Sequence, residues 1–427
     1  NGWMVKRLLD FLSREISGLH EAAYLLGFFA ICSQVLALFR DRILASEFGA
    51  GNVLDIYYSA FRIPDILFVT VASIVSVSVL IPFLMERMDK GDVEAKQFID
   101  SVFTFFFIFI SVIGIIAYIT APFLMAKLFP LFTTSTDFPE LVSLTRILIL
   151  SPVFLGFSNL LASITQIHKR FFLYAISPVL YNVGIIFGIK FLYPIFGLSG
   201  LGYGVILGAF LHFSTQIPFI LSKGMFPKFR FPIKLGFIKN IILTSLPRTI
   251  TVSANELAEL FLVSFASFFV VGSISIFNFS FNLQSVPFSI IGISYSLAAF
   301  PTLTRLFSSG NKDKFVEQMI TSSRHIIFWS VPISVLFIVL RAQIVRTILG
   351  AGRFNWDDTR LTAAALALFT VSLVAQNLVT LFVRSYYSQG KTKTPLIMNV
   401  FSAGLIVVGS YFFISLFQTN EYFKYFI

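Results

Sequence analysis

Long apolar runs separated by short polar connections follow one another along the whole chain. Each run reaches or exceeds the roughly 20 residues that an α-helix needs to cross the hydrocarbon core of a bilayer. We therefore expect eleven membrane-spanning helices and a twelfth that begins near residue 421. Their approximate ranges are 22–45, 54–85, 98–128, 140–167, 170–193, 199–222, 238–270, 273–306, 315–348, 358–388 and 394–416. The predicted fold class is an all-α polytopic membrane protein.

Composition and charge support this prediction. The 427 residues are 56% hydrophobic and only 12% charged, whereas a soluble protein would carry about twice that charged share. The net charge is +11. Loops that face an anionic leaflet account for this excess of Lys and Arg better than nucleic-acid binding does. We expect no nucleic-acid partner.

The distribution of basic residues predicts an orientation. With a cytoplasmic N-terminus, 19 Lys and Arg residues lie in cytoplasmic segments and 8 lie on the opposite side. This asymmetry satisfies the positive-inside rule, so we expect the N-terminus in the cytoplasm. Residues 3–18 place apolar and charged side chains on opposite helical faces, which predicts a helix lying in the membrane interface.

Residue types that catalysis and metal binding require show no useful pattern. Cys32 is the only cysteine, so no intrachain disulfide can form. The four histidines lack metal-ligand spacing, and the chain has no nucleophile elbow and no Gly-rich phosphate loop. We expect neither an enzyme nor a metal or other cofactor.

The second predicted helix carries charges within an apolar run. At 100° per residue, Asp55, Tyr58, Arg62 and Asp65 share a stripe about 80° wide. Pro64 cannot donate a backbone hydrogen bond and is expected to kink the helix. Such a helix suits a cavity wall or a moving gate. An internal ion pair that ties two helices together is the alternative.

The seventh predicted helix has a similar polar stripe. Arg248, Thr251, Asn255 and Glu259 share one face, and Glu256 lies about 80° away. Two carboxylates one turn apart in a bilayer seldom both ionise. This is the chemistry of a proton or cation carrier, so Asn255, Glu256 and Glu259 are candidates for coupling. Neutralisation by Arg248 or by a facing helix stays open.

The eighth predicted helix carries two asparagines on one face. Asn278 and Asn282 could line a cavity, although polar stripes of this kind also join helices without a further role. Pro287 lies in the middle of the same helix and is a second candidate kink.

Three arginines lie in or at the ends of other predicted helices. Arg40 and Arg42 end the first helix, where they could bind phosphate or reach lipid headgroups. Arg146 in the fourth helix is expected to be paired or to reach toward the interface, and no role is assigned to it.

The most polar connection divides the chain near its centre. We expect an N-terminal lobe over 1–222, a basic cytoplasmic linker over 223–237 and a C-terminal lobe over 238–427. Pro64 and Pro287 occupy corresponding places in the second helix of each lobe. Two related six-helix lobes around a central cavity are a common transporter plan. Prolines are also simply frequent in membrane helices.

Several short motifs together resemble one family. They are Phe-Arg-Asp-Arg at 39–42, Phe-Gly-Ala-Gly at 48–51, Asp55, Ala-Phe-Arg-Ile-Pro at 60–64, Pro-Thr-Leu at 301–303, Tyr-Ser at 387–388 and Lys-Thr-Pro at 393–395. In order and spacing, the chain resembles the MviN/MurJ family along essentially its whole length.

The resemblance implies a fold, an activity and a location. The fold is that of the multidrug/oligosaccharidyl-lipid/polysaccharide exporters, with fourteen helices, so the sequence is expected to be truncated within its final segments. The activity is flipping of lipid II, the undecaprenyl-pyrophosphate-linked peptidoglycan precursor, from the inner to the outer leaflet by alternating access. The location is the bacterial inner membrane. Lipid II, membrane lipids and a coupling cation are the expected partners of a monomer.

The resemblance also assigns residues, with departures from the family pattern. Arg40, Asp55 and Arg62 match polar positions of the family's cationic cavity. We add Arg248, Asn278 and Asn282 as candidate substrate-binding residues. Gln34, Phe68, Val69, Ser73, Ile74 and Asn282 stand where the family usually carries other residues, most of them charged. We therefore expect fewer cationic side chains in the cavity. The eleventh helix carries Asn399 and no acidic residue, so sodium coupling would lack an acidic ligand from that helix.

Two alternatives follow from these departures. One is a cation-coupled small-molecule exporter of the same superfamily, which the paired glutamates favour. The other is a flippase for a different polyprenyl-linked glycan.

Overall fold

The computed structural model describes residues 19–74 and 76–419, and within these ranges all regular elements are helices. The first half contains α2 (Leu19–Phe48), α3 (Asn52–Ile74), α4 (Val77–Met88), α5 (Asp92–Leu128), η1 (Pro130–Thr134), α6 (Phe138–Leu148), α7 (Ser151–Ile167), α8 (Phe171–Phe187), η2 (Gly188–Leu192), α9 (Tyr193–Phe196), α10 (Leu198–Ser214) and α11 (Ile217–Ser222). The second half contains α12 (Leu235–Ala266), α13 (Ser273–Phe288), η3 (Ser289–Ile293), α14 (Ser294–Ser308), α15 (Lys312–Val339), α16 (Arg341–Ile348), α17 (Trp356–Val371), α18 (Leu373–Ser388) and α19 (Lys393–Thr419). The predicted interfacial helix at 3–18 and the twelfth helix near 421 lie outside the described residues.

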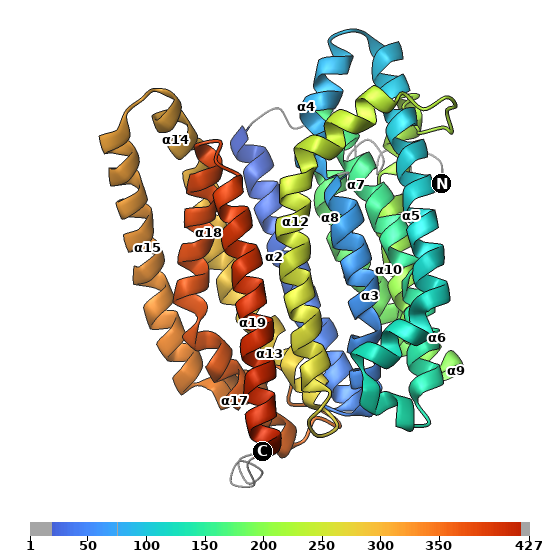
Figure 1. Ribbon diagram of the computed structural model, residues 1–427, viewed down its shortest axis with the longest axis vertical. Helices are drawn as coiled ribbons and strands as arrows, with labels where there is room; N and C mark the ends of the chain where they lie inside the picture. The colour runs from blue at the N-terminus through green and yellow to red at the C-terminus, as the bar shows by residue number, and fades with distance from the viewer. Residues whose placement is uncertain (1–18, 75, 420–427) are drawn as a thin grey trace, which may run out of the picture. The chain divides into compact units, whose positions relative to one another are not determined.

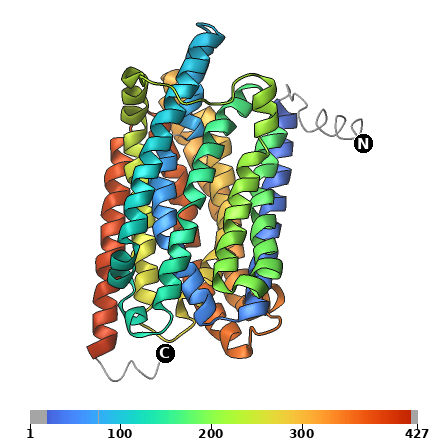
Figure 2. The same cartoon turned by 90° about the vertical axis from the view of Figure 1, so that its right-hand side faces the viewer.

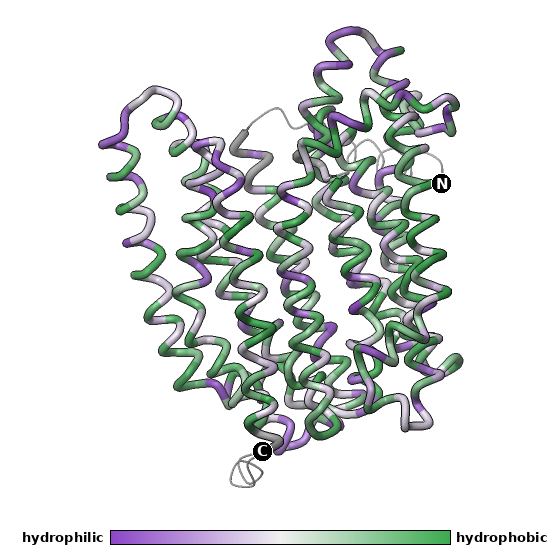
Figure 3. Tube along the Cα trace, in the orientation of Figure 1, coloured by the Kyte–Doolittle hydropathy of each residue, from purple (hydrophilic) through white to green (hydrophobic). Residues whose placement is uncertain are grey.

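The number of membrane-spanning segments agrees with the sequence pattern. Ten described segments are long and apolar enough to cross a membrane, and α17 with α18 forms an eleventh that bends by 43°. Hydrophobic residues run along these helices, and polar residues gather in the segments that join them (Figure 3). The predicted all-α membrane fold is confirmed.

Packing divides the chain into two compact units. Among the described residues, unit 1 contains 19–40, 59–74 and 76–257, and unit 2 contains 41–58 and 258–419. The chain therefore passes from one unit to the other within α2, α3 and α12. This partition differs from the predicted lobes, whose boundary at 223–237 stays a prediction.

Unit 1 has a large apolar core and a close helix contact. Phe98, Phe106 and Ile164 are fully buried in this core. Next to it, α8 and α10 run side by side (Figure 2). A Cβ on Gly204 would clash with the backbone of Gly188, so the small residues let the two helix backbones touch, as in many membrane helix pairs.

The basic segment between α11 and α12 is fastened to α5 of unit 1. The Lys228 backbone amide donates to Asp100 Oδ1 at 2.8 Å, and the Arg230 amide donates to Thr104 Oγ1 at 2.9 Å. This segment is therefore held by specific hydrogen bonds.

Unit 2 packs α14 and α15 against α18, and Figure 1 shows α15 beside α18. Its core includes Leu303, Ile326 and Leu381. Between α13 and α14 the chain forms one turn of π-helix, η3. Such turns inside α-helices frequently occur at functional sites. Here Gly292 gives room for the Asn377 side chain, which a Cβ would meet.

Candidate functional site

The turn between α2 and α3 is docked in unit 2. Gly49 has a φ of 67°, and a Cβ there would lie 3.0 Å from the carbonyl oxygen of Arg353. The Arg353 amide donates to the Ser46 carbonyl at 2.9 Å, and the Ala50 amide donates to Asp358 Oδ2 at 3.3 Å. The Phe-Gly-Ala-Gly motif is thus explained by close backbone contact.

Asp55 binds the N-terminus of α13. Its Oδ2 accepts from the Gly272 amide at 2.6 Å. Its Oδ1 accepts from the Ser275 amide at 2.8 Å and from Ser275 Oγ at 2.5 Å. The first amides of a helix have no partner within the helix, and a carboxylate there also complements the helix dipole. The carboxylate of Asp55, which is 4% exposed, therefore fixes α13 to α3.

Neighbouring polar residues make similar structural contacts in unit 2. Arg42 Nη1 donates to the carbonyls of Thr347 and Ile348 at 2.6 and 2.9 Å, at the C-terminus of α16. Asn282 Nδ2 donates to Oδ2 of the buried Asp41 at 2.9 Å. Arginine at a helix C-terminus satisfies carbonyls that the helix leaves open.

A second group of polar residues lies on α2, α3 and α8 in unit 1. Arg40 Nη1 donates to Asn182 Oδ1 at 3.0 Å. Tyr181 precedes Asn182 in α8. Asp65 Oδ2 lies 4.0 Å from Arg62 Nη2. Arg40 on α2 and Arg62 on α3 both belong to unit 1, and we call the residues of these two contacts, with Tyr181, the arginine cluster: Arg40, Arg62, Asp65, Tyr181 and Asn182.

The ion pair within this cluster is loose and partly open. The Arg62 side chain is 7% exposed, whereas the Asp65 side chain is 41% exposed. A separation of 4.0 Å lies at the limit of an ion pair and beyond hydrogen-bond distance. Another acceptor could approach Arg62 without breaking a short hydrogen bond to Asp65.

Hydroxyl groups connect α3 to α12 within unit 1. Thr70 and Ser253 share a hydrogen bond of 3.1 Å, and Ser73 and Thr249 share one of 2.7 Å. We call these four residues the hydroxyl ladder. The exposed Arg248 reaches Ser76 Oγ at 3.5 Å beside it. The sequence analysis did not predict this ladder. Its signal is that Thr70 and Ser73 are three residues apart and Thr249 and Ser253 four apart, so each pair shares a helix face.

The remaining candidates are not gathered into one site. Glu256 and Glu259 are half-buried on successive turns of α12, Asn255 is exposed, and the boundary between the units falls at Leu257. Asn278 is buried and donates to the Ile274 carbonyl of its own helix at 2.8 Å. Across the described residues, no three His, Cys, Asp or Glu side chains are placed to hold a metal ion.

The two candidate kinks lie inside helices. α3 continues through Pro64 and ends at Ile74, and α13 contains Pro287 one residue before its end. Only Pro287 is followed directly by an irregular turn, η3. Whether either proline acts in a gate stays a prediction.

Sequence reasoning also missed the partners on α8. Asn182 and Tyr181 lie in an apolar helix, and Asn182 is buried. A buried amide inside a membrane helix needs hydrogen-bond partners, so its position was the available signal. It gave no indication that the partner would be Arg40.

Comparisons with known proteins agree in sequence and in structure. A family model described as lipid II flippase MurJ matches residues 44–421. A probable lipid II flippase MurJ of Buchnera aphidicola subsp. Schizaphis graminum is 27% identical over 92% of this chain and 77% of its own length. Lipid II flippase MurJ of Burkholderia cenocepacia is 25% identical over 89% of this chain and 75% of its own length.

Solved structures give the same picture of the fold. A lipid II flippase MurJ in an inward closed conformation superposes with a TM-score of 0.77 at 25% identity, covering 90% of this chain and 80% of that one. An inward-facing multidrug resistance MATE family transporter superposes with a TM-score of 0.70 at 15% identity, covering 91% of this chain and 96% of that one. At 15% identity, the second likeness concerns the fold alone.

Proposed function

This chain belongs to the MurJ family of lipid II flippases, and from that premise we propose that it moves lipid II from the inner to the outer leaflet by alternating access. Lipid II is a polyprenyl-pyrophosphate glycan, so a carrier must offer cationic groups to the pyrophosphate at membrane depth. The protein acts within a multi-pass membrane fold, with a cytoplasmic N-terminus and as a monomer.

The arginine cluster is the observation that carries the assignment of residues. It holds the guanidinium groups of Arg40 and Arg62 on helices that are long and apolar enough to cross a membrane. Guanidinium groups bind phosphate through two parallel hydrogen bonds. In the bound state the pyrophosphate replaces Asp65 as an acceptor for Arg62. The 4.0 Å separation and the partly exposed carboxylate favour this exchange.

The other candidate residues have different roles in the proposal. Asp55 fixes α13 through its three hydrogen bonds, so we assign it to the scaffold rather than to substrate. Asn278 and Asn282 contact the sugar or the peptide when the helices move. Arg248 is exposed and receives the pyrophosphate at another stage of the cycle.

The two glutamates of α12 provide a candidate for energy coupling. Glu256 and Glu259 are half-buried on successive turns of α12. Binding of a cation there, or the membrane potential at about 2.3 kcal/mol per charge per 100 mV, resets the carrier.

Genetic complementation tests the function. A strain depleted of its own lipid II flippase is supplied with this chain in its full natural length, and outer-leaflet lipid II is measured by accessibility to an external probe. The intact protein should restore growth and accessibility, and Arg62→Ala should restore neither. Arg360→Ala, which removes an exposed arginine from α17, is the matched control and should behave like the intact protein.

Two results would contradict the proposal. Normal accessibility with Arg62→Ala would remove the arginine cluster from substrate binding. If the intact protein is present in the membrane and never restores accessibility, the substrate is different, and a flippase for another polyprenyl-linked glycan becomes the better reading.

A second candidate function rests on the paired glutamates and the MATE-like fold. In this reading the chain exports a small organic cation in exchange for a proton or sodium ion. Uptake of a fluorescent organic cation into inverted vesicles, abolished by Glu259→Gln and unaffected by Arg62→Ala, would favour this candidate over lipid II transport.

A further inference from the structure

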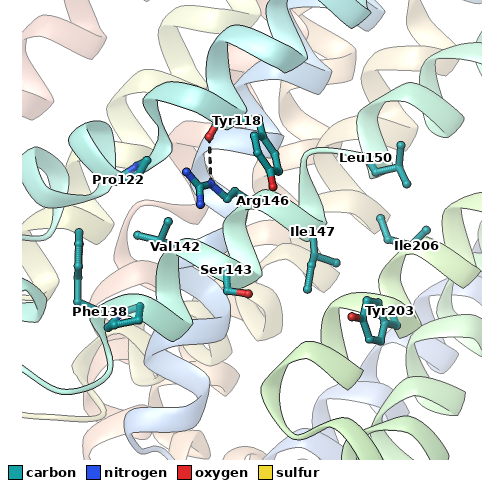
Figure 4. Close-up of a pocket in the computed structure, with 11 residues that line it drawn as sticks. Tyr118, Pro122, Phe138, Val142, Ser143, Arg146, Ile147, Leu150, Tyr203 and Ile206 are labelled. Atoms are coloured by element: carbon teal, nitrogen blue, oxygen red, sulfur yellow. Dashed lines mark hydrogen bonds between the residues drawn. The ribbon is translucent and has the colours of Figure 1, made fainter.

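A groove in unit 1 lies on three helices that contribute nothing to the arginine cluster. It has a volume of about 690 Å³ and is formed by α5, α6 and α10, with Leu150 from the turn before α7 (Figure 4). This volume lies within the roughly 300–1,000 Å³ that is usual for small-molecule sites. Most of its lining is apolar, including Pro122, Ile147, Leu150 and Ile206. The groove can therefore accommodate part of a hydrocarbon chain.

Arg146 is the one basic residue among the eleven that line the groove, and none of the eleven is acidic. Its Nε donates to the Tyr118 carbonyl oxygen at 3.1 Å, and its guanidinium carbon lies 4.7 Å from the centre of the Tyr118 ring. Within the described part of the chain, these are its contacts. The two Nη groups therefore carry a positive charge into an apolar groove that supplies no counter-ion.

The depth of Arg146 brings it within reach of the lipid headgroups. It lies eight residues after Phe138, the first residue of α6, which is about 12 Å along a helix. The span 138–167 has 30 residues and is about 45 Å long, against about 30 Å of hydrocarbon. For a centred span, Arg146 lies only about 4–5 Å inside the hydrocarbon boundary, within reach of a phosphate.

We propose that this groove binds one anionic phospholipid, with its phosphate on Arg146 and an acyl chain along the apolar wall. Ser143 and Tyr203 turn their hydroxyls toward the groove (Figure 4) and add donors for the headgroup. A charged arginine facing lipid is unfavourable unless its charge is compensated, and a lipid phosphate compensates it. This site goes beyond the proposed transport of lipid II and does not depend on it.

Lipid binding to the purified full chain tests the site. The protein in detergent is incubated with phosphatidylglycerol or with phosphatidylcholine of the same acyl chains, and bound lipids are counted by native mass spectrometry. The intact chain should bind one phosphatidylglycerol about tenfold more tightly than phosphatidylcholine, the effect of one charge-assisted contact. Arg146→Gln should remove this preference, and Arg146→Lys, which keeps the charge without the planar fork, should retain part of it.

Two further variants distinguish lipid binding in the groove from a general effect of positive charge on the protein. Leu150→Trp places a larger side chain at an exposed position of the groove and should lower binding of both lipids. Arg341→Gln removes an exposed arginine from the start of α16 and should leave the preference unchanged. Size-exclusion chromatography and thermal unfolding verify that each variant is folded. If Arg146→Gln is unfolded, Arg146→Lys and Leu150→Trp decide the question.

Several results would overturn the proposal. They are equal binding of the two lipids by the intact chain, an unchanged preference in Arg146→Gln or an equal loss of preference in Arg341→Gln. Displacement of the lipid by millimolar inorganic phosphate would show a site for free phosphate without an acyl-chain component, and this too would overturn it. Retention of the lipid under these conditions supports the phospholipid site.

Discussion

The two ends of α3 carry charged side chains on one face of the helix, but the structure holds them differently. Residues 52–58 belong to unit 2, where Asp55 accepts three hydrogen bonds from Gly272 and Ser275. Residues 59–74 belong to unit 1, where Arg62 and Asp65 lie 4.0 Å apart and Asp65 is 41% exposed. A charge that fixes a helix terminus is part of the scaffold. A loosely paired charge can exchange its partner, which a substrate site requires.

Substitution of Asp55 should give the largest effect on stability. Asp55→Ala leaves the first amides of α13 buried without an acceptor, so we expect a loss of about 3–5 kcal/mol. Asp55→Asn keeps the shape and should lose less. Thermal unfolding of the purified protein in detergent measures both. Asp357→Ala, on an exposed ion pair of α17, is the control and should change little. A stable Asp55→Ala protein that fails only in transport would instead place Asp55 in the substrate site.

Substitution of Arg62 should affect transport more than stability, which is the opposite of what we expect for Asp55. If Arg62 binds the pyrophosphate as proposed, Arg62→Ala removes a charge-assisted contact, so initial rates of lipid II appearance in the outer leaflet should fall about 10- to 100-fold. The free energy of unfolding should fall by less than in Asp55→Ala, because Arg62 lies 4.0 Å from Asp65 whereas Asp55 accepts three short hydrogen bonds. Arg62→Lys should recover part of the rate. A loss of stability as large as that of Asp55→Ala would erase the difference between the two ends.

The turn that precedes α3 offers a smaller test of the docked end. Gly49 has a φ of 67° and approaches the Arg353 carbonyl, so Gly49→Ala should destabilise the protein by about 1–2 kcal/mol. Gly27→Ala, where a Cβ meets nothing within 4 Å, is the matched control in α2. Thermal unfolding of the two variants gives the comparison. Equal stability would mean that the turn is not fixed by this contact.

The sequence predicted the helices well because the bilayer imposes a strict requirement. Each span needs roughly 20 apolar residues with all backbone groups bonded internally, and this leaves a pattern that can be read without partners. Helical periodicity also placed Asp55, Arg62 and Asp65 on one face. Periodicity describes one helix at a time, so it could not show that α3 changes unit after Tyr58.

The contacts that the sequence could not predict join residues that are far apart in the chain. Asp55 meets Ser275, 220 residues away, and Arg42 meets Thr347, 305 residues away. An isolated charged residue in an apolar run shows that a partner is needed, but not whether that partner is a helix terminus or a substrate. The π-helical turn η3 also has no periodic signature in the sequence.

Substitutions in the hydroxyl ladder should give the smallest effect on stability. They test how far along α3 the scaffold extends. Ser73 and Thr249 share a hydrogen bond of 2.7 Å between α3 and α12, and a neutral hydrogen bond contributes about 0.5–1.5 kcal/mol. A double-mutant cycle of Ser73→Ala and Thr249→Val in thermal unfolding should give a coupling energy in that range. The pair of Ser73→Ala with Thr304→Val, whose hydroxyl bonds within its own helix α14, should give none. If the coupling between Ser73 and Thr249 is absent while transport falls, we would assign the hydroxyl ladder to transport, together with Arg62 and Asp65 of the same helix. If it is present and transport is unchanged, Ser73 also belongs to the scaffold, and Arg62 and Asp65 are the residues of α3 that we propose for the substrate site.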